Sequence, residues 1–540
     1  MKNLSRRNFL KKGAALTTGS LIASQSSVFA TKVKQSIRPS RGTIRIDPEP
    51  LFDISPNFYM QFMEPLGTTE PAVEAAWDYI KDDWREDLVN CVQDLSPGMI
   101  RWGGNFIRYY KWREGIGPVK DRPWMYNYYW GGKETNRVGT HEFVDFCRRV
   151  GADPLLVVNF MSDGVERFKN TIHGNNRMGT AKEAADWVSY CNDPDNAERK
   201  ANGTPSPLNV KYWQIGNETS YSFVKSKFNK GSAIKHTIEF AKAMKERDPS
   251  IHLIGWGDVP KPWRFRPGKN QQDNALWAGD MLQEAGEYLD MIAIHLMGVS
   301  PQNSKLLTGF EYQKDPEAAW NELLELSEIA EFRLGYLDDV LTSMQVDTKV
   351  AITEGHLSLS PHNINTILQE WLSAAYHART MNTYLRHGDR VKICTGADFC
   401  GTRWTVNAVR IPVPRGGSFL LPIGAIMKLY KKYGGNQGIK VMNAPNDLDV
   451  AATRNQDKLF LHVLNKSFSK SMNATLQVKG FEVSSAKSYQ IAPNDARSYV
   501  DRERSDTFEP QEIPLEISAN GAEGKFPPTS VSVVELRLEG

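Results

Sequence analysis

Two runs of residues with the pattern of buried strands each end on a glutamate. Residues 210–218 read Val-Lys-Tyr-Trp-Gln-Ile-Gly-Asn-Glu, and residues 349–354 read Lys-Val-Ala-Ile-Thr-Glu. A (β/α)8 barrel places its reactive groups at the carboxyl ends of its buried parallel strands. Glycosidic bond cleavage needs two carboxyl groups, because one donates a proton while the other attacks the anomeric carbon or activates water. The two runs therefore predict a glycoside hydrolase with Glu218 and Glu354 as its catalytic pair.

The surroundings of the two glutamates predict different roles for them. Glu218 follows an aromatic, apolar strand whose burial could raise the pKa of a carboxyl group, so we expect it to be the general acid/base. Glu354 is expected to be the nucleophile, with Arg101 as a cation that keeps it ionised. A carboxyl separation of roughly 5 Å would imply retention of anomeric configuration, and one of roughly 6.5 to 9.5 Å would imply inversion.

From residue 58 to residue 394 the chain alternates short apolar segments with longer amphipathic ones. Eight segments are expected to be strands: 58–63, 99–102, 155–160, 210–215, 252–256, 291–295, 350–353 and 391–394. Helical spacing occurs between them, for example at 142–150, 181–190, 234–246, 275–289 and 364–386. This alternation predicts an α/β fold, a (β/α)8 TIM barrel. A doubly wound open sheet is the competing architecture, but no strand is followed by a glycine-rich phosphate turn.

Polar side chains stand at most of the predicted strand ends, and parallel strands in a barrel deliver them to one mouth. They are Glu64, Arg101, Asn105, Asn159, Asn217, Glu218, His295 and Glu354. The carboxamide of Asn217 could hold a sugar hydroxyl next to Glu218. No spacing of histidine, cysteine or acidic residues indicates a metal site.

The pattern changes after about residue 432 to alternating polar and apolar residues separated by Asn, Gly, Pro and Ser clusters. We expect a β-sandwich domain at 433–540 after a catalytic barrel at 51–432. The segment 31–50, whose residues 42–46 also alternate, is expected to pair with that sandwich.

Residues 1–30 resemble an export signal. Adjacent arginines at Arg6 and Arg7 precede a weakly apolar stretch, and Ala30 offers a small residue for cleavage. We expect twin-arginine export and a periplasmic or secreted mature protein. No later apolar run approaches the roughly 20 residues that span a bilayer, so no membrane association is expected after cleavage.

Composition excludes some classes of partner. The formal net charge of +3 over 540 residues is nearly balanced, and no lysine or arginine stripe suits nucleic acid. Five cysteines cannot all pair, so we expect buried thiols; Cys394 and Cys400 are the only pair close enough in sequence to suggest a bridge. The expected partner is a carbohydrate substrate.

Several motifs resemble those of the glycoside hydrolase family 51 α-L-arabinofuranosidases, most densely between residues 51 and 218. They are Arg101-Trp102-Gly103-Gly104-Asn105-Phe106, Gly115-Ile116-Gly117-Pro118, Arg122-Pro123, the run 134–143, Asn159, and Trp213-Gln214-Ile215-Gly216-Asn217-Glu218. The resemblance implies a retaining, exo-acting enzyme of the barrel clan A that needs no cofactor. By the same resemblance, Glu64, Asn105, Asn217 and His295 bind the furanose, Arg101 lies among them, and the protein assembles as a homo-oligomer. The expected reaction releases terminal arabinofuranose from plant-type polysaccharides.

The chain departs from that family around the expected nucleophile. Met297 stands where the family has a tyrosine, Thr353 and Gly355 flank Glu354 in place of aspartate and tryptophan, and Asp398 aligns with a sugar-binding glutamine. Two alternatives stay open: another clan A glycosidase acting on a different furanoside or a β-pyranoside, and a non-catalytic carbohydrate-binding barrel.

Other polar and aromatic residues are expected to have structural roles. His356 and His362 are expected at the surface or behind the substrate-contacting residues. The aromatic residues between 112 and 130 are expected to pack loops, with one or two of them stacking on sugar rings.

Overall fold

The structure is a computed structural model that describes residues 40–168, 176–220, 228–259, 277–301 and 303–539. These residues belong to one compact unit that begins at Pro39. The predicted export signal at 1–30 lies outside the described residues. No helix in the described part of the chain is both long enough and apolar enough to cross a bilayer.

Eight parallel strands form the predicted barrel. In chain order they are β2 (Met60–Met63), β5 (Met99–Trp102), β8 (Asp153–Val158), β9 (Tyr212–Ile215), β10 (His252–Trp256), β11 (Met291–His295), β13 (Lys349–Glu354) and β15 (Val391–Cys394). Each pairs with its neighbour in the sequence of strands. A parallel bridge between Tyr59 and Cys394 joins the first strand to the last and closes the ring. The sequence prediction of a (β/α)8 barrel is confirmed.

The barrel closes around a packed interior. One apolar cluster takes side chains from the barrel strands, including Met60, Met99, Ile254 and Ile393, and Tyr212 of β9 packs against it. Residues on consecutive strands that point inward stack in layers. Most of these side chains are apolar, and the buried polar ones within the strands include Gln61, Arg101 and Gln214.

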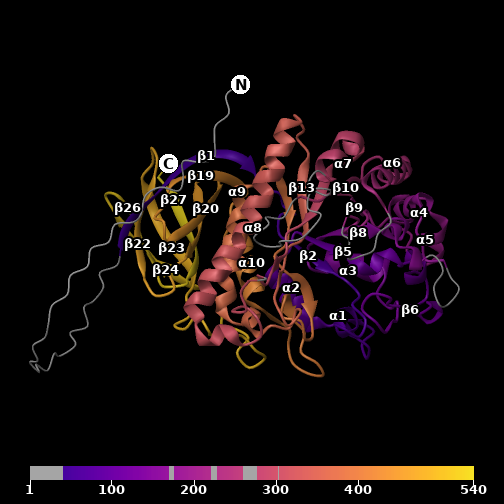
Figure 1. The fold of residues 1–540 in the computed structure, drawn as a ribbon, viewed down its shortest axis with the longest axis horizontal. Coiled ribbons are helices and arrows are strands. Elements are labelled where there is room, and N and C mark those ends of the chain that lie inside the picture. The colour runs from indigo at the N-terminus through magenta and orange to yellow at the C-terminus, as the bar shows by residue number, and fades with distance from the viewer. Residues whose placement is uncertain (1–39, 169–175, 221–227, 260–276, 302, 540) are drawn as a thin grey trace, which may run out of the picture. The chain divides into compact units, whose positions relative to one another are not determined.

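Helices cover the outside of the barrel (Figure 1). They are α2 (Glu86–Leu95), α3 (Thr140–Arg149), α4 (Ala181–Asn192), α6 (Lys230–Arg247), α7 (Trp277–Ala285), α8 (Pro316–Ser343), α9 (Ala374–Arg386) and α10 (Pro422–Lys432), with the short α1 (Ala72–Ala75) and α5 (Ala197–Ala201). The predicted helix at 364–386 starts late, at Ala374. The Asn365 side chain accepts a hydrogen bond from Ile367 N and caps a 3₁₀ turn, and Trp371 N bonds to Ser498 O, so the segment is held as turns.

Short strands line the connections at the carboxyl ends of the barrel strands. They are β3 (Trp77–Asp78), β4 (Asp83–Trp84), β6 (Met125–Tyr126), β7 (Lys133–Glu134), β12 (Gly298–Val299), β14 (Leu357–Ser358), β16 (Asp398–Gly401), β17 (Asn407–Arg410) and β18 (Phe419–Leu420). The pairing of β12 with β14 ties the connection after β11 to the one after β13.

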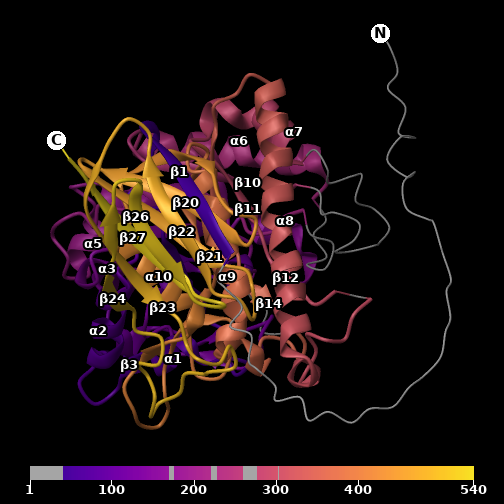
Figure 2. The same ribbon diagram turned by 90° about the vertical axis from the view of Figure 1, so that its left-hand side faces the viewer.

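A second sheet of ten strands contains most of the carboxy-terminal residues. It comprises β1 (Ser40–Asp53), β19 (Gln437–Asn443), β20 (Leu448–Asn455), β21 (Lys458–Asn465), β22 (Met472–Val478), β23 (Val483–Ile491), β24 (Gln511–Pro514), β25 (Glu516–Ser518), β26 (Gly521–Phe526) and β27 (Val531–Leu538). β1, drawn in indigo, lies among the yellow strands, paired with β19 and β22 (Figures 1 and 2). The strands follow one continuous order around a separate apolar core, so the layers of the predicted sandwich are parts of one sheet.

Buried indoles join this sheet to the barrel helices. Trp371 Nε1 donates to Thr529 O at 2.9 Å, and Trp320 Nε1 on α8 donates to Lys466 O at 2.7 Å. The long helix α8 lies beside α9, and Figure 2 shows it along its whole length. All five cysteines are free thiols, including Cys394 and Cys400.

Candidate active site

Glu64 follows the first barrel strand and is held by the loop after the second. Its Oε1 accepts hydrogen bonds from Asn105 N at 2.7 Å, Phe106 N at 3.2 Å and Trp130 Nε1 at 2.9 Å. Gly104 allows this contact: its φ is +131°, and a Cβ there would lie 2.1 Å from Glu64 Oε2. Burial raises the pKa of Glu64 well above its ordinary value, and the nearby Glu354 raises it further. Glu64 therefore offers the site a fixed carboxyl group that readily stays protonated.

Arg101 lies inside the second strand and is fully buried. Its guanidinium donates to Gln214 Oε1 at 3.0 Å, to Glu354 Oε1 at 3.1 Å and to Asn217 Oδ1 at 2.6 Å. The planar guanidinium of Arg101 thus connects the fourth strand to the seventh. Burial lowers the pKa of Arg101, while the charge of Glu354 opposes that effect. The structure brings Arg101 to Glu354 as the sequence predicts.

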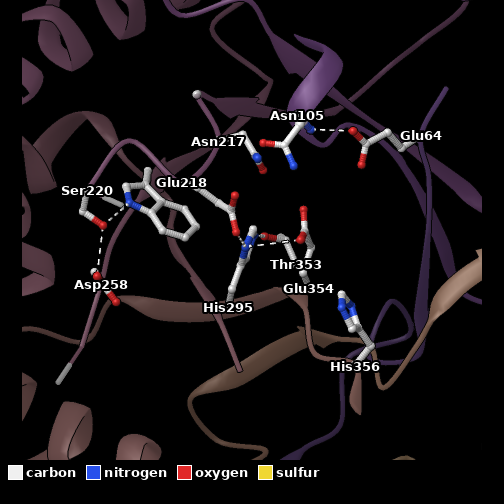
Figure 3. Close-up of polar contacts among 12 residues, drawn as sticks. Glu64, Asn105, Asn217, Glu218, Ser220, Asp258, His295, Thr353, Glu354 and His356 are labelled. Carbon is white, nitrogen blue, oxygen red and sulfur yellow. Dashed lines mark hydrogen bonds and ion pairs between the residues drawn. The ribbon is translucent and has the colours of Figure 1, made fainter. Parts of the chain in front are cut away.

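Glu218, His295 and Glu354 point toward one another from three strand ends (Figure 3). His295 Nδ1 lies 3.1 Å from Glu218 Oε1 and 3.5 Å from Glu354 Oε2, and its Nε2 lies 3.1 Å from Thr353 Oγ1. Burial lowers the pKa of His295 to about 3, so the ring is neutral in neutral solution. A neutral ring between the two carboxyl groups orients them by hydrogen bonds and adds no charge.

The two catalytic candidates are close enough for a retaining mechanism. One oxygen of Glu218, one oxygen of Glu354 and one nitrogen of His295 all lie within 4.8 Å of one another. Retaining glycosidases hold their two carboxyl groups roughly 5 to 5.5 Å apart, while inverting ones need roughly 6.5 to 9.5 Å to admit a water. The spacing therefore favours attack by one carboxylate on the sugar.

The same trio is the one group of potential metal ligands among the described residues. The sequence spacing indicates no such group, because its members come from three strands far apart in the chain. Arg101 lies 3.1 Å from Glu354 and already supplies a positive charge there. A second cation would be repelled by the guanidinium, so this arrangement fits two reacting carboxyl groups better than a metal centre.

Asn105 and Asn217 meet through Arg108. Arg108 Nη1 donates to Asn105 Oδ1, and its Nη2 donates to the backbone oxygen of Asn217 at 2.6 Å. The Nδ2 atom of Asn217 is buried and has no hydrogen-bond partner among the described residues. A buried amide donor of this kind is costly unless a ligand accepts from it, so Asn217 is suited to bind a sugar oxygen.

A cavity of about 420 Å³ opens onto these groups. Glu64, Asn105, Glu218 and Glu354 line it, whereas Arg101, Asn217 and His295 lie just behind. Of the predicted aromatic candidates, Tyr129 and Trp130 reach the cavity, where Trp404 also contributes a ring. A volume of this size with polar groups at its base and aromatic rings at its wall is typical of a small-molecule site.

The strand-end prediction at Asn159 turns out differently, whereas Trp112 has the packing role expected for most of the aromatic residues. Asn159 does not reach the cavity: its Nδ2 donates to Tyr110 O and Arg177 O, and its Oδ1 accepts from Ser162 N, so the whole amide is used by the backbone. Trp112 is buried and stacks on Trp187, with ring centroids 5.9 Å apart.

His356 is the main residue that sequence reasoning misplaces. It lines the cavity and pairs with Asp398 through Nδ1 and Oδ1 at 2.9 Å. Burial alone would lower the pKa of His356, but the charge and hydrogen bonding of Asp398 raise it overall. The available signal is the position of His356 two residues after Glu354, because alternate residues of an extended chain face the same side. Its partner lies 42 positions away in sequence, which no local pattern reveals.

Two of the residues that depart from the family pattern line the cavity close to His356. Met297, which follows β11, and Asp398, which begins β16, both line the cavity, whereas Thr353 lies behind it against His295. His362 lies at the cavity as well, with its ring edge against Trp404 at a centroid distance of 5.9 Å. This part of the cavity lining therefore combines an apolar methionine with the charged pair of His356 and Asp398.

A closed parallel barrel with paired carboxyl groups on its fourth and seventh strands defines a class, the (β/α)8-barrel glycoside hydrolases. Comparisons with known proteins show which members of this class the chain is similar to. Residues 91–312 match the model of the alpha-L-arabinofuranosidase 1 domain, a region that contains Arg101, Asn105, Asn217, Glu218 and His295.

The curated relatives that the chain matches are also named as arabinofuranosidases. The chain is 32% identical over 284 residues to a probable alpha-L-arabinofuranosidase C of Aspergillus niger, which covers 51% of this chain and 52% of the relative. It is 31% identical over 251 residues to an intracellular exo-alpha-(1->5)-L-arabinofuranosidase of Halalkalibacterium halodurans, covering 45% of each. The chain thus spans about half the length of the curated relatives it matches.

Solved structures extend the likeness of the fold to nearly the whole chain. The α-L-arabinofuranosidase of Thermotoga maritima, in a complex with arabinose, superposes with a TM-score of 0.70 at 24% identity, over 92% of this chain and 100% of that one. A GH51 arabinofuranosidase from Xanthomonas axonopodis pv. citri gives a TM-score of 0.72 at 21% identity, over 92% and 99%. The resemblance to glycoside hydrolase family 51 that the sequence indicates is confirmed, and so is the fold.

Proposed function

We propose that this protein is a retaining α-L-arabinofuranosidase that releases terminal arabinofuranosyl residues by double displacement. The observation that carries the proposal is the 4.8 Å limit on the distances among Glu218, His295 and Glu354 at the base of the cavity. The match of residues 91–312 to the arabinofuranosidase domain supports the choice of sugar.

In the first step, a carboxylate oxygen of Glu354 attacks the anomeric carbon while Glu218 donates its proton to the leaving oxygen. The glycosidic C–O bond breaks, and a glycosyl ester forms on Glu354. In the second step, Glu218 takes a proton from water, the water oxygen attacks the anomeric carbon, and the ester bond to Glu354 breaks. Two inversions leave the released sugar with its original configuration.

The other cavity residues hold the sugar. Glu64, fixed by three hydrogen bonds, and the amides of Asn105 and Asn217 are assigned to furanose hydroxyls. We add His356 and Asp398 to this set, because both line the cavity beside Glu354. Arg101 acts on the nucleophile and on Asn217, and His295 orients both carboxyl groups.

The names of the relatives suggest the substrate class. The Halalkalibacterium halodurans protein is named for exo action on α-1,5-linked arabinofuranosyl residues. We propose exo action on plant-type polysaccharides or oligosaccharides for this chain as well, since the cavity of about 420 Å³ admits one sugar ring more readily than a long chain.

We also propose that the mature protein works outside the cytoplasm after twin-arginine export, although that relative is named as intracellular. The paired Arg6 and Arg7 and the small residue Ala30 support export. Fractionation of cells that express the full chain, compared with an Arg6→Lys, Arg7→Lys variant, tests it. Assembly as a homo-oligomer stays a prediction, and light scattering on the purified protein tests it.

A panel of 4-nitrophenyl glycosides tests the function. We expect hydrolysis of the α-L-arabinofuranoside and little of the β-D-galactofuranoside or β-D-xylopyranoside, with NMR showing the α-anomer as the first product. Activity on another glycoside alone would discard arabinose and keep the mechanism. If the β-anomer formed first, double displacement would be wrong, and a protein that binds sugars but cleaves none of them would be the non-catalytic barrel.

A further inference from the structure

A buried turn directly behind Glu218 has an unusual backbone. Met161, Ser162 and Asp163 have φ values of +48°, +54° and +48°, a left-handed conformation that residues with side chains seldom adopt and almost never in succession. Ser162 and Asp163 are 0% exposed. Strained backbone of this kind persists only where surrounding contacts enforce it, and it gathers at functional sites.

The Asp163 carboxylate contacts the Glu218 loop on both sides of Glu218. Its Oδ1 accepts from Thr219 Oγ1 at 3.0 Å and from Asn217 N at 3.4 Å. Gly216 makes room for it: its φ is +75°, and a Cβ there would lie 2.9 Å from Asp163 Oδ1. Glu218 itself has a φ of +54°. The left-handed turn at Asp163 thus supports a second left-handed residue, the proposed acid/base.

The same carboxylate pairs with a cation that lies close to Glu218. Arg108 Nε lies 3.1 Å from Asp163 Oδ2, and Arg108 Nη2 lies 3.9 Å from Glu218 Oε2. The side chains of Arg108 and Asp163 are 1% and 0% exposed, so water does not screen their charges. Burial raises the pKa of Asp163 to about 6 while Arg108 opposes that rise, so Asp163 carries its charge at and above neutral pH, where the alkaline limb is measured. Arg108 therefore stands between two carboxyl groups, of which one must be able to keep a proton for catalysis.

We propose that Asp163 is a positioning residue for Glu218: it fixes the loop that aims Glu218, and it neutralises Arg108 so that Glu218 retains the proton that the leaving group needs. The inference rests on the proposed function, because it takes Glu218 as the acid/base. Without the Asp163 charge, the Arg108 cation would favour the ionised form of Glu218.

Other titratable groups that lie near Glu218 are His295, Tyr129, Glu354 and His356. His295 is neutral near pH 7, because burial lowers its pKa to about 3. Tyr129 is neutral as well, since burial raises the pKa of its hydroxyl. The charge of Glu354 is paired with Arg101 at 3.1 Å. Asp398 raises the pKa of His356 and pairs with it at 2.9 Å, so the charge of His356 has its own partner. Substitutions at Arg108 and Asp163 therefore change the charge near Glu218 in opposite directions.

The test is the pH dependence of kcat/KM in Asp163→Asn and Arg108→Gln. Asparagine keeps an acceptor for Thr219 but takes the countercharge from Arg108, so the alkaline limb should move to lower pH by about one unit or more. Arg108→Gln removes the cation and keeps the Asp163 charge, so its alkaline limb should move to higher pH. Opposite displacements are the signature of a charge effect, since general damage to the fold would move neither limb or both alike.

A second readout separates proton donation from folding. For Asp163→Asn we expect a fall in kcat/KM of about 10²-fold on methyl α-L-arabinofuranoside, whose leaving group needs a proton, and only a few-fold on the 2,4-dinitrophenyl glycoside. Thr219→Val serves as the matched control: it removes one loop hydrogen bond without changing charge and should lower kcat with the alkaline limb unmoved.

Wild type and Glu218→Ala are measured first. A wild type without hydrolysis, or a Glu218→Ala variant as active as wild type, would overturn the proposed function together with this inference. An active wild type that depends on Glu218, combined with alkaline limbs that do not move in opposite directions, would overturn the inference alone. If Asp163→Asn fails to fold, Asp163→Ala takes its place, and the same opposite displacements against Arg108→Gln are required.

Discussion

The two catalytic candidates, Glu354 and Glu218, differ in how the arginine beside each of them is paired. Glu354 receives a direct hydrogen bond from its cation, Arg101, at 3.1 Å, and the other donors of Arg101 go to neutral amides. Glu218 lies 3.9 Å from its cation, Arg108, whose charge is paired with Asp163. An unshared cation in contact keeps a carboxylate ionised, whereas a cation shared with another carboxylate lets its neighbour hold a proton. Under the proposed function, this difference would prepare Glu354 to attack and Glu218 to donate a proton.

The largest effect should follow removal of the attacking carboxylate. Glu354→Ala is expected to lower kcat by a factor on the order of 10⁴ or more for every leaving group, because no covalent ester can form. Initial rates on aryl arabinofuranosides measure this. Glu370→Gln, a buried glutamate that bonds Tyr312 and Arg497 away from the cavity, is the control and should keep its activity. A Glu354→Ala variant with more than a hundredth of wild-type activity would contradict the assignment.

Removal of the proton donor should have an effect that depends on the leaving group. Glu218→Ala is expected to lose about 10²- to 10⁴-fold on methyl α-L-arabinofuranoside and much less in the glycosylation step with 2,4-dinitrophenolate as leaving group. Added azide should restore turnover, because it attacks the glycosyl ester without a general base. The glycosyl azide should have the α configuration of the substrate, which NMR can verify. Equal losses for both leaving groups would remove Glu218 from the acid/base role.

A substitution that keeps the positive charge of Arg101 but changes the shape of its side chain tests the role of this residue. Arg101→Lys keeps the cation but cannot reach Gln214, Asn217 and Glu354 together, so kcat/KM should fall by about 10²-fold. Arg199→Lys is the matched control, because Arg199 is equally buried but bonds only backbone oxygens remote from the cavity. It should lower the thermal midpoint and leave kcat/KM nearly unchanged. If both variants lost activity in parallel, Arg101 would have no special role.

The smallest effect is expected at the cavity wall. Asp398→Asn should raise KM about tenfold and change kcat little, because His356 loses the partner that favours its protonated form. Asp398 raises the pKa of His356 against burial, so the wild-type imidazolium persists until the pH exceeds that raised value. In Asp398→Asn the largest opposition to burial is removed and the charge of Glu354 is the main one left, so the rise of KM with pH should begin at a lower pH. A KM profile that keeps its inflection would show that His356 does not contact the sugar.

Local patterns are enough to predict the barrel and the two glutamates at its strand ends. Each barrel strand is a short apolar run, and the residue that ends it is fixed by sequence position, so Glu218, His295 and Glu354 can be placed at strand ends from the amino-acid sequence alone. The prediction at 364–386 is partly wrong because Trp371 N bonds to Ser498 in the second sheet, a contact that helical spacing does not contain. Local patterns also do not predict a role for Asp163 and Arg108, because that role depends on the contact between these residues in the folded protein.

The sequence by itself determined which residues are apolar, where strands end and which acids stand there, because these depend on neighbours within a few positions. The pairing of Arg101 with Glu354 could be predicted from the sequence, but only the tertiary structure decided that Arg108 pairs with Asp163 and His356 with Asp398. Barrel closure brings residues from distant strands to within hydrogen-bond distance in a buried site, where Coulomb interactions are weakly screened. The chemical difference between two identical glutamates arises there.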